Sequence, residues 1–250
     1  CLMENYLAAL ATHTGPLLAI FFAAFLQAIT GFGLVIVAAP LLMFFYDPKI
    51  VVPVMLLLAC SGNTVQAYLM RKKANLPLIG HLVIGVLLGI PIGFFVFDYV
   101  SSDTLKVWIS TVVFLSLLIM QISHRHIPES RRNTIITGMC SGFSSMTTGM
   151  AGPPFLIYLA YTKMSAETFR ATCFVFFLCC NSTSLIGYLV GGHPLTSAVH
   201  EFIYLLPALA AGLSLGHALA RFIPTSLLRR LIFFVLYATC IYTIWSVVSK

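Results

Sequence analysis

Two interruptions in long apolar segments carry the residues best able to bind a ligand. The first holds an amide, a hydroxyl and two glycines: Gln27, Thr30, Gly31 and Gly33. The second holds hydroxyls and a glycine before a Gly-Pro-Pro run: Ser144, Ser145, Thr148 and Gly149. Glycine frees φ and proline removes an amide donor, so a helix breaks most easily there. A helix restarting after such a break points unpaired N–H groups and a partial positive charge at the break, which favours an anion.

The side chains at both breaks can add hydrogen-bond donors to these amides. The donors are the carboxamide of Gln27 and the hydroxyls of Thr30, Ser144, Ser145 and Thr148. A single Ser or Thr in a helix often bonds back to its own backbone instead. Because equivalent clusters recur in two parts of the chain, we predict that they bind substrate.

Three further amides lie inside the segments that follow the breaks. Asn63 and Asn181 stand at matching positions, and Gln66 lies three residues beyond Asn63 on the same helical face. One interpretation is helix–helix adhesion, worth about 0.6 to 2 kcal/mol per contact. The other is that the amides line a binding site between the breaks, since paired broken helices hold the substrate in many transporters.

Arg170 lies at the start of the sixth apolar segment. It can act as an anchor that extends its charge to the membrane interface. Alternatively it binds the anion at the inner mouth, because the planar guanidinium matches oxyanions. The first half has Val52 at the equivalent position, so this residue is not duplicated.

The composition requires a membrane to position these residues. Of 250 residues, only 8% are charged and 60% are hydrophobic, and the mean hydropathy is +0.99. A water-soluble domain carries about 25% charged residues, so that class is excluded. Runs that are apolar on every side exclude the alternating strands of an outer-membrane barrel. The net charge of +7 comes from short clusters between apolar runs, which indicates topology signals and no nucleic-acid partner. We therefore predict one all-α polytopic membrane domain over residues 1–250.

The apolar segments divide the chain into two similar halves. Eight segments are expected, at residues 15–46, 50–70, 77–97, 104–122, 133–161, 166–190, 199–220 and 225–248. The break motifs and the asparagines recur 118 residues apart, and the pairs Gly89/Gly93 and Gly212/Gly216, which fit close helix packing, recur 123 apart. We interpret this as a duplication, with repeat 1 at about 15–122 and repeat 2 at about 133–249.

The cations indicate how the two broken segments lie in the membrane. If all eight segments cross, the 14 cations divide seven to seven, which gives no orientation signal. If each broken segment instead turns back to its own side, eleven cations lie on one side of the membrane and three on the other, as the positive-inside tendency requires. This predicts two inverted repeats, each a re-entrant broken helix pair plus three transmembrane helices. A broken single crossing is the alternative.

The remaining reactive side chains indicate no catalytic or metal chemistry. Every acid lies at a segment end or in a loop, which argues against a carboxylate-driven proton pump. His81 and His217 are expected to be neutral and packed, with proton coupling or haem ligation as minority alternatives. The seven cysteines lack metal-type spacing and are expected to be free thiols. Residues 1–15 lack the basic start of a signal peptide. We expect no cofactor and no metal.

The pattern resembles the sulfite exporter TauE/SafE family of membrane transporters. The resemblance rests on Gln27-Ala-Ile-Thr-Gly-Phe-Gly33 with Pro40, on Gly138-Met-Cys-Ser-Gly142, on Thr148-Gly-Met-Ala-Gly-Pro-Pro154 and on Arg170-Ala-Thr172. It implies a multi-pass exporter in the cell inner (plasma) membrane for sulfite, sulfoacetate or other sulfonates, and no enzyme activity.

Under this interpretation the anion binds near the bilayer midplane and is carried by alternating access. The expected partners are the small anion, the lipid bilayer and protons as a candidate coupling ion. A passive anion channel is the first alternative function. An intramembrane haem protein or enzyme is the second.

Overall fold

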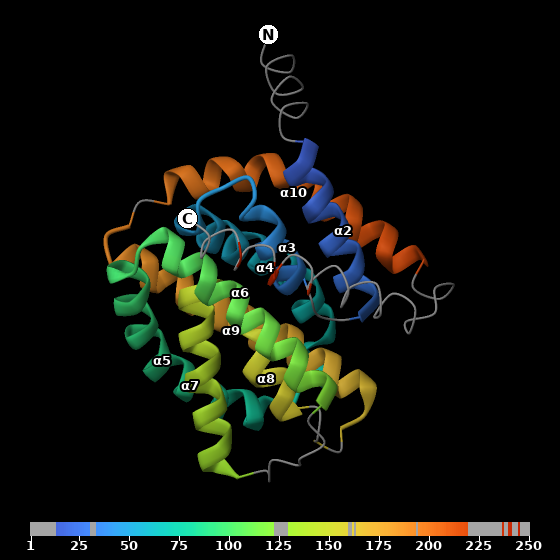
Figure 1. The fold of residues 1–250 in the computed structure, drawn as a ribbon. Coiled ribbons are helices and arrows are strands. Elements are labelled where there is room, and N and C mark those ends of the chain that lie inside the picture. Colours follow the sequence, from blue (N-terminus) through green and yellow to red (C-terminus); the bar gives the residue numbers. More distant parts are fainter. Residues whose placement is uncertain are drawn as a thin grey trace.

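The described residues of the chain form helices throughout (Figure 1). In this computed structural model they are residues 14–30, 34–122, 130–159, 162, 164–193 and 195–219, with 237, 240, 241 and 245. The helices are α2 (Thr14–Thr30), α3 (Leu34–Leu42), α4 (Pro48–Met70), the 3-10 turn η1 (Arg71–Lys73), α5 (Leu76–Tyr99), α6 (Ser102–Ile122), α7 (Arg131–Thr148), α8 (Gly152–Leu159), α9 (Ala166–Val190) and α10 (Thr196–Leu219). The first seven predicted segments therefore appear at nearly the predicted positions. The eighth, at 225–248, lies almost wholly outside the described residues.

Polar residues at the helix starts explain why the helices begin where they do. The side chains of Asp47, Asn75, Ser130 and Ser165 accept hydrogen bonds from the first turns of α4, α5, α7 and α9. Such caps satisfy amide donors that a helix start leaves unpaired. Between the caps the chain is almost continuously apolar. A helix of 24 residues such as α5 is about 36 Å long, enough to cross a hydrocarbon core of about 30 Å.

Each predicted broken segment is a pair of helices that folds back on itself. In the second pair, the Thr134 hydroxyl near the start of α7 lies 2.8 Å from the Tyr158 hydroxyl near the end of α8. In the first pair, the ring of Phe45 just after α3 lies against Gly15 at the start of α2. The far ends of each pair therefore meet, which gives two helical hairpins.

Glycines let each hairpin pack closely against a helix of the opposite half, α7 against α5 and α2 against α10. A Cβ at Gly85 or Gly89 of α5 would overlap backbone carbonyl oxygens of α7, and one at Gly212 of α10 would overlap the carbonyl oxygen of Phe21 in α2. The predicted close-packing role of the repeated glycines is confirmed. Figure 1 shows both pairs side by side, α10 with α2 and α5 with α7.

The same contacts fix the relative directions of these helices. Along α5 and α7 the contacting residue numbers rise together, since Gly85 faces Ile135 and Gly93 faces Phe143, so the two helices are parallel. In α10 and α2, Gly212 faces Phe21 and Gly216 faces Phe25, so this pair is also parallel.

Helices α4 and α9 cross at the centre of the fold in opposite directions. The Cys60 thiol of α4 lies 3.7 Å from the Ser182 hydroxyl of α9. Further along, Lys73 of η1 contacts Glu167, and the Asn75 amide donates to the Thr172 hydroxyl. Helix α4 has two thirds of its apolar stretch buried, the largest share among the candidate spans. These two helices carry the predicted asparagines.

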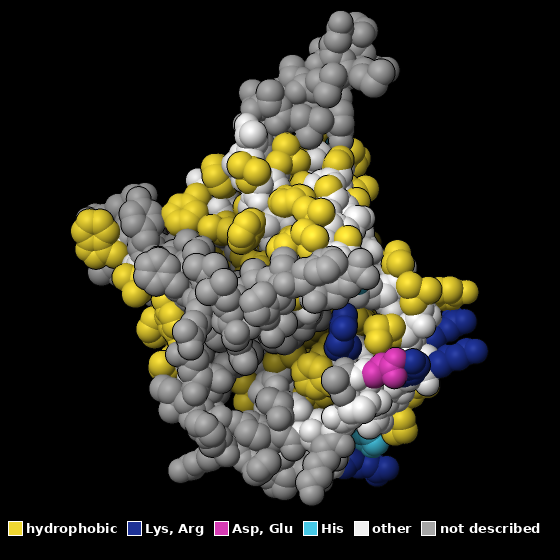
Figure 2. All heavy atoms as spheres, turned by 90° about the vertical axis from the view of Figure 1, so that its right-hand side faces the viewer, with side chains coloured by type: hydrophobic (Ala, Val, Ile, Leu, Met, Phe, Trp, Pro, Cys, Tyr) yellow, Lys and Arg dark blue, Asp and Glu magenta, His cyan; other side chains and the backbone are white. Residues whose placement is uncertain are grey.

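The outward faces of the helices are apolar, as expected for a protein surrounded by lipid. Four described helices are long and apolar enough to cross a membrane: α4 with η1, α5, α9 and α10. Large side chains such as Leu87 and Phe95 of α5 are more than half exposed. Figure 2 shows hydrophobic side chains spread over the upper part of one face. A soluble monomer seldom exposes so much contiguous apolar surface. The chain is a membrane protein.

Charged residues gather at the two ends of the helix bundle. At one end, called the basic end, lie Arg71–Lys73 with Arg131 and Arg132, and Arg131 Nε donates to His81 Nε2 at 2.9 Å. The opposite end, called the acidic end, contains Asp47, Asp98 and Asp103. There the Ser102 hydroxyl donates to Asp47, and Lys49 Nζ lies 3.5 Å from the Asp98 carbonyl oxygen.

The acidic end also includes the turn after α3. Burial and the neighbouring Glu201 carboxylate raise the pKa of the Tyr46 phenol there. Tyr46 is therefore a neutral hydrogen-bonding group at any physiological pH.

Candidate functional site

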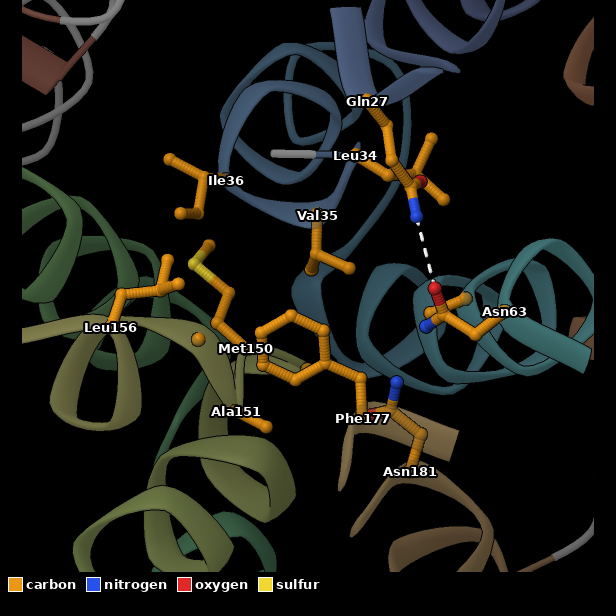
Figure 3. A pocket seen from close by; sticks show the side chains of 13 residues that line it. Gln27, Leu34, Val35, Ile36, Asn63, Met150, Ala151, Leu156, Phe177 and Asn181 are labelled. Carbon is orange, nitrogen blue, oxygen red and sulfur yellow. Dashed lines mark hydrogen bonds between the residues drawn. The ribbon is translucent and has the colours of Figure 1, made fainter. Parts of the chain in front are cut away.

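A cavity lies where the two helix breaks meet (Figure 3). Residues from α2, α3, α4, α8 and α9 and from the α7–α8 break surround it, and the cavity has a volume of about 40 Å³. At least 10–15 Å³ is needed for one water molecule, so a few small groups fit. The lining residues are Gln27, Leu34, Val35, Ile36, Ala59, Asn63, Gly149, Met150, Ala151, Gly152, Leu156, Phe177 and Asn181. None of them is charged.

One hydrogen bond in the cavity wall occurs twice, at positions related by the 118-residue repeat. Gln27 Nε2 of α2 donates to Asn63 Oδ1 of α4 at 3.0 Å, and Ser145 Oγ of α7 donates to Asn181 Oδ1 of α9 at 3.3 Å. Both pairs are buried and 36 residues apart in the chain. Each asparagine oxygen is therefore occupied by a residue of its own half.

The occupied oxygens leave the asparagine nitrogens as donors at the cavity. Figure 3 shows the amide groups of Asn63 and Asn181 near each other at the cavity, with Asn181 directing its nitrogen toward Asn63. Asn63 and Asn181 are only 2% and 3% exposed. An amide nitrogen that faces a cavity can donate to a bound group, so this pair favours a ligand that accepts hydrogen bonds.

Two helices next to the breaks contribute to the cavity wall. Leu34, Val35 and Ile36 of α3 line the cavity. Residues 31–33 before them lie outside the described residues, so the amide donors expected at the first break stay a prediction. Helix α8 begins Gly152-Pro153-Pro154, and its two prolines have no N–H to give. The start of α8 is therefore a weak source of donors.

Gly149 ends α7 in a conformation that few other residues adopt. Its φ is +74°, and its N–H donates to the Ser145 carbonyl oxygen at 2.9 Å. Glycine is favoured at such left-handed caps because it has no Cβ. This cap ends α7 just before Met150, which lines the cavity. The break therefore lies at the glycine that predicts it.

The predicted hydroxyls have different surroundings. Ser145 bonds Asn181 as described, and its oxygen also lies 2.9 Å from the Ser184 hydroxyl. The Thr148 hydroxyl donates to the Ser144 carbonyl oxygen at 2.7 Å and accepts from the Met150 amide. Thr148 therefore bonds back to its own helix and shapes the break. Ser144 is buried but does not line the cavity.

Five other predicted residues lie outside the cavity wall or outside the described region. Gly31 and Gly33 lie outside the described residues, and so does the side chain of Thr30. Gln66 is buried one turn beyond Asn63, but it is not among the lining residues. Arg170 is half-buried near the basic end, and the structure does not bring it to the cavity.

Sequence reasoning missed the apolar wall and Ser184. Val35, Met150 and Phe177 close much of the cavity, but nothing distinguishes them in a chain that is 60% hydrophobic. Ser184 could have been found, because it stands 118 residues after Gln66. The repeat relation therefore carries more information than residue type alone.

The two candidate haem-ligand histidines do not face a common site. His81 accepts from Arg131 and has its other ring nitrogen 2.8 Å from the Pro77 carbonyl oxygen, so both nitrogens are occupied. His217 lies on α10 with Nδ1 2.8 Å from the Leu213 carbonyl oxygen; His217 is exposed and His81 is partly exposed. Within the part of the chain that the structure describes, no three His, Cys, Asp or Glu side chains are placed to hold a metal ion.

Comparison with known proteins identifies the family. A family model described as "Sulfite exporter TauE/SafE" matches residues 17–243, nearly the whole chain and both helix breaks. No curated protein and no solved structure gives a significant match.

Proposed function

Because the chain belongs to the sulfite exporter TauE/SafE family, whose members are membrane transporters of sulfite-type anions, we propose how it binds and moves its substrate. The protein exports a small sulfur-containing or organic anion, such as sulfite, sulfoacetate or another sulfonate. The anion occupies the cavity between the two breaks and crosses the cell inner membrane by alternating access.

The observation that carries this proposal is the repeated asparagine pair. Asn63 and Asn181 have their oxygens bonded within the protein, and both line the cavity, where their nitrogens would donate to the anion. Leu34, Val35 and Ile36 of α3 line the same cavity, and the amide N–H groups predicted at the first break would add donors there. Non-helical backbone at membrane depth is tolerated where it lines a polar cavity, which supports a functional role for the breaks.

We propose that the two halves are inverted repeats. Three observations support this: α5 is parallel to α7, α10 is parallel to α2, and α4 is antiparallel to α9. The hairpins then enter the membrane from opposite sides and reach the cavity from each face. The basic end faces the cytoplasm, following the positive-inside tendency. Rocking one half against the other would expose the cavity alternately.

Uptake of labelled sulfite into proteoliposomes tests the transport mechanism. We expect the rate to saturate with concentration and to increase when unlabelled sulfite is present on the opposite side, because one carrier site alternates between the two faces. Empty liposomes are the control. A flux that rises linearly and shows no counterflow would support a passive channel and contradict alternating access.

Cysteine labelling tests the re-entrant hairpin. In a background with the native cysteines replaced by alanine, Arg132→Cys before the hairpin and Ser165→Cys after it should react with an impermeant maleimide only after cells are permeabilised. Ser197→Cys at the start of α10 should react in intact cells. All three variants lie at exposed positions. Opposite sidedness of positions 132 and 165 would mean that α7 and α8 form one broken crossing.

A further inference from the structure

Two glutamine side chains of the first half each carry a buried polar atom with no hydrogen-bond partner. The atoms are Gln27 Oε1, an acceptor, and Gln66 Nε2, a donor, and neither has a partner among the described residues. The side chains are only 3% and 8% exposed. A buried polar atom is normally paired, so two complementary unpaired atoms near one cavity require an explanation.

The second half shows what the first half lacks. Gln27, Asn63 and Gln66 correspond, 118 residues later, to Ser145, Asn181 and Ser184. In the second half Ser145 contacts both partners, at 3.3 Å to Asn181 and 2.9 Å to Ser184. Among the described residues, the first-half set shows the Gln27–Asn63 bond and no bond between Gln27 and Gln66. By the repeat relation, the counterpart of the Ser145–Ser184 contact would join Gln27 to Gln66, and each of these two side chains carries one of the unpaired atoms.

A group that fits between these atoms must accept one hydrogen bond and donate another. A hydroxyl does both, whereas a fully ionised oxyanion only accepts. We propose that Gln27 Oε1 and Gln66 Nε2 form a subsite for the O–H of a singly protonated oxyanion. For sulfite, the bound species is hydrogen sulfite and not the dianion. This inference rests on the proposed function and specifies the form of its substrate.

The charge of the cavity favours the same species. No charged side chain among the described residues lines the cavity, so these residues provide no counter-ion for a bound anion. The cost of removing an ion from water rises with the square of its charge, and it is large even for a single charge. A monoanion held by amide donors is therefore far less costly in this cavity than a dianion such as sulfite or sulfate.

Carrying the proton on the substrate also fits the positions of the titratable groups. The described helices around the cavity carry titratable or charged side chains, but none of these lines it: Lys49, Cys60 and Tyr68 of α4, Arg131, Arg132 and Cys140 of α7, Tyr158 of α8, Glu167, Arg170, Cys173, Cys179, Cys180 and Tyr188 of α9, and His200, Glu201, Tyr204 and His217 of α10. Each transported hydrogen sulfite moves one proton without a carboxylate relay in the protein.

Binding at different pH values tests the subsite on the purified full-length chain. Sulfite and methanesulfonate are titrated by calorimetry on both sides of the second ionisation of sulfite. Methanesulfonate stays a monoanion and has no O–H. We expect the apparent Kd of total sulfite to rise about tenfold per pH unit above that ionisation, while the Kd of methanesulfonate stays constant. Unchanged or tighter sulfite binding at high pH would overturn the proposal and assign the position to a water molecule.

A pair of variants separates the subsite from a general preference for monoanions. Gln66→Met removes the donor and should weaken hydrogen sulfite binding about tenfold, with methanesulfonate changed less than about twofold. Ser184→Ala, the equivalent position in the other half, should leave the ratio of the two affinities unchanged. Equal weakening of both ligands by Gln66→Met would overturn the subsite. If neither anion binds at any pH, the proposed function is contradicted instead. The pH titration uses the wild-type chain, so it does not depend on whether a variant folds.

Discussion

Changing Asn181 or Asn63 to aspartate is expected to reduce sulfite transport at least about hundredfold. The substitution keeps the size of the side chain and keeps Oδ1 as the acceptor for Ser145 or Gln27. It replaces the donor that faces the cavity with a carboxylate oxygen. Hydrogen bonds to charged groups contribute about 1.5–3 kcal/mol each, and a carboxylate adds repulsion of the anion. The measurement is the initial rate of labelled sulfite uptake at equal amounts of reconstituted protein.

The matched control is Asn75→Asp at the basic end. Asn75 caps α5 by accepting from the Leu78 amide, and aspartate caps a helix as well as asparagine does. We expect this variant to transport at the wild-type rate. Wild-type rates in both Asn63→Asp and Asn181→Asp would show that the cavity does not hold the anion. The Tm of each variant is compared with that of the wild type. An unchanged Tm shows that a lower transport rate comes from the altered site and not from unfolding.

Alanine at Gly89 or Gly138 is expected to have the largest effect on stability. A Cβ at Gly89 would overlap the carbonyl oxygen of Met139, and one at Gly138 would overlap that of Leu82. Backbone atoms cannot rotate away, so α5 and α7 must separate along their length. Overpacking costs about 1–3 kcal/mol even where side chains can adjust. We expect a clear fall in Tm for each variant and loss of folded protein when both are combined.

Gly80→Ala on the same helix is the control, because a Cβ there meets nothing within 4 Å. Alanine favours helix formation over glycine by up to about 1 kcal/mol. Gly80→Ala should therefore match the wild-type Tm or exceed it slightly. If Gly89→Ala and Gly80→Ala unfold at the same temperature, the close approach of α5 and α7 is not essential to the fold.

The positions of the helices could be predicted because their causes are local. Apolar runs with capping residues such as Asn75 and Ser130 predict helix starts to within a few residues. Gly149 with the prolines after it predicts the second break, since a left-handed residue and missing amide donors end a helix whatever surrounds it. The family could also be predicted, because its motifs lie at these local features.

The partners of the polar side chains could not be predicted. Thr148 and Ser145 have hydroxyls in the same break, yet Thr148 bonds to its own helix while Ser145 bonds to Asn181. Both choices satisfy a hydroxyl equally well, so residue type cannot decide between them. Arg170 is a similar case: its guanidinium matches an anion, but the α9 start lies away from the cavity.

The sequence by itself determined that this chain is a helical membrane protein of a transporter family, with two breaks and two matching asparagines. These properties follow from composition and from local backbone preferences. Only the tertiary structure decided that each broken segment folds back as a hairpin, that Gln27 and Ser145 occupy the oxygens of the asparagines, and that Gln66 Nε2 has no partner among the described residues. Those outcomes depend on contacts between helices distant in sequence, where many pairings are chemically equivalent and packing selects one.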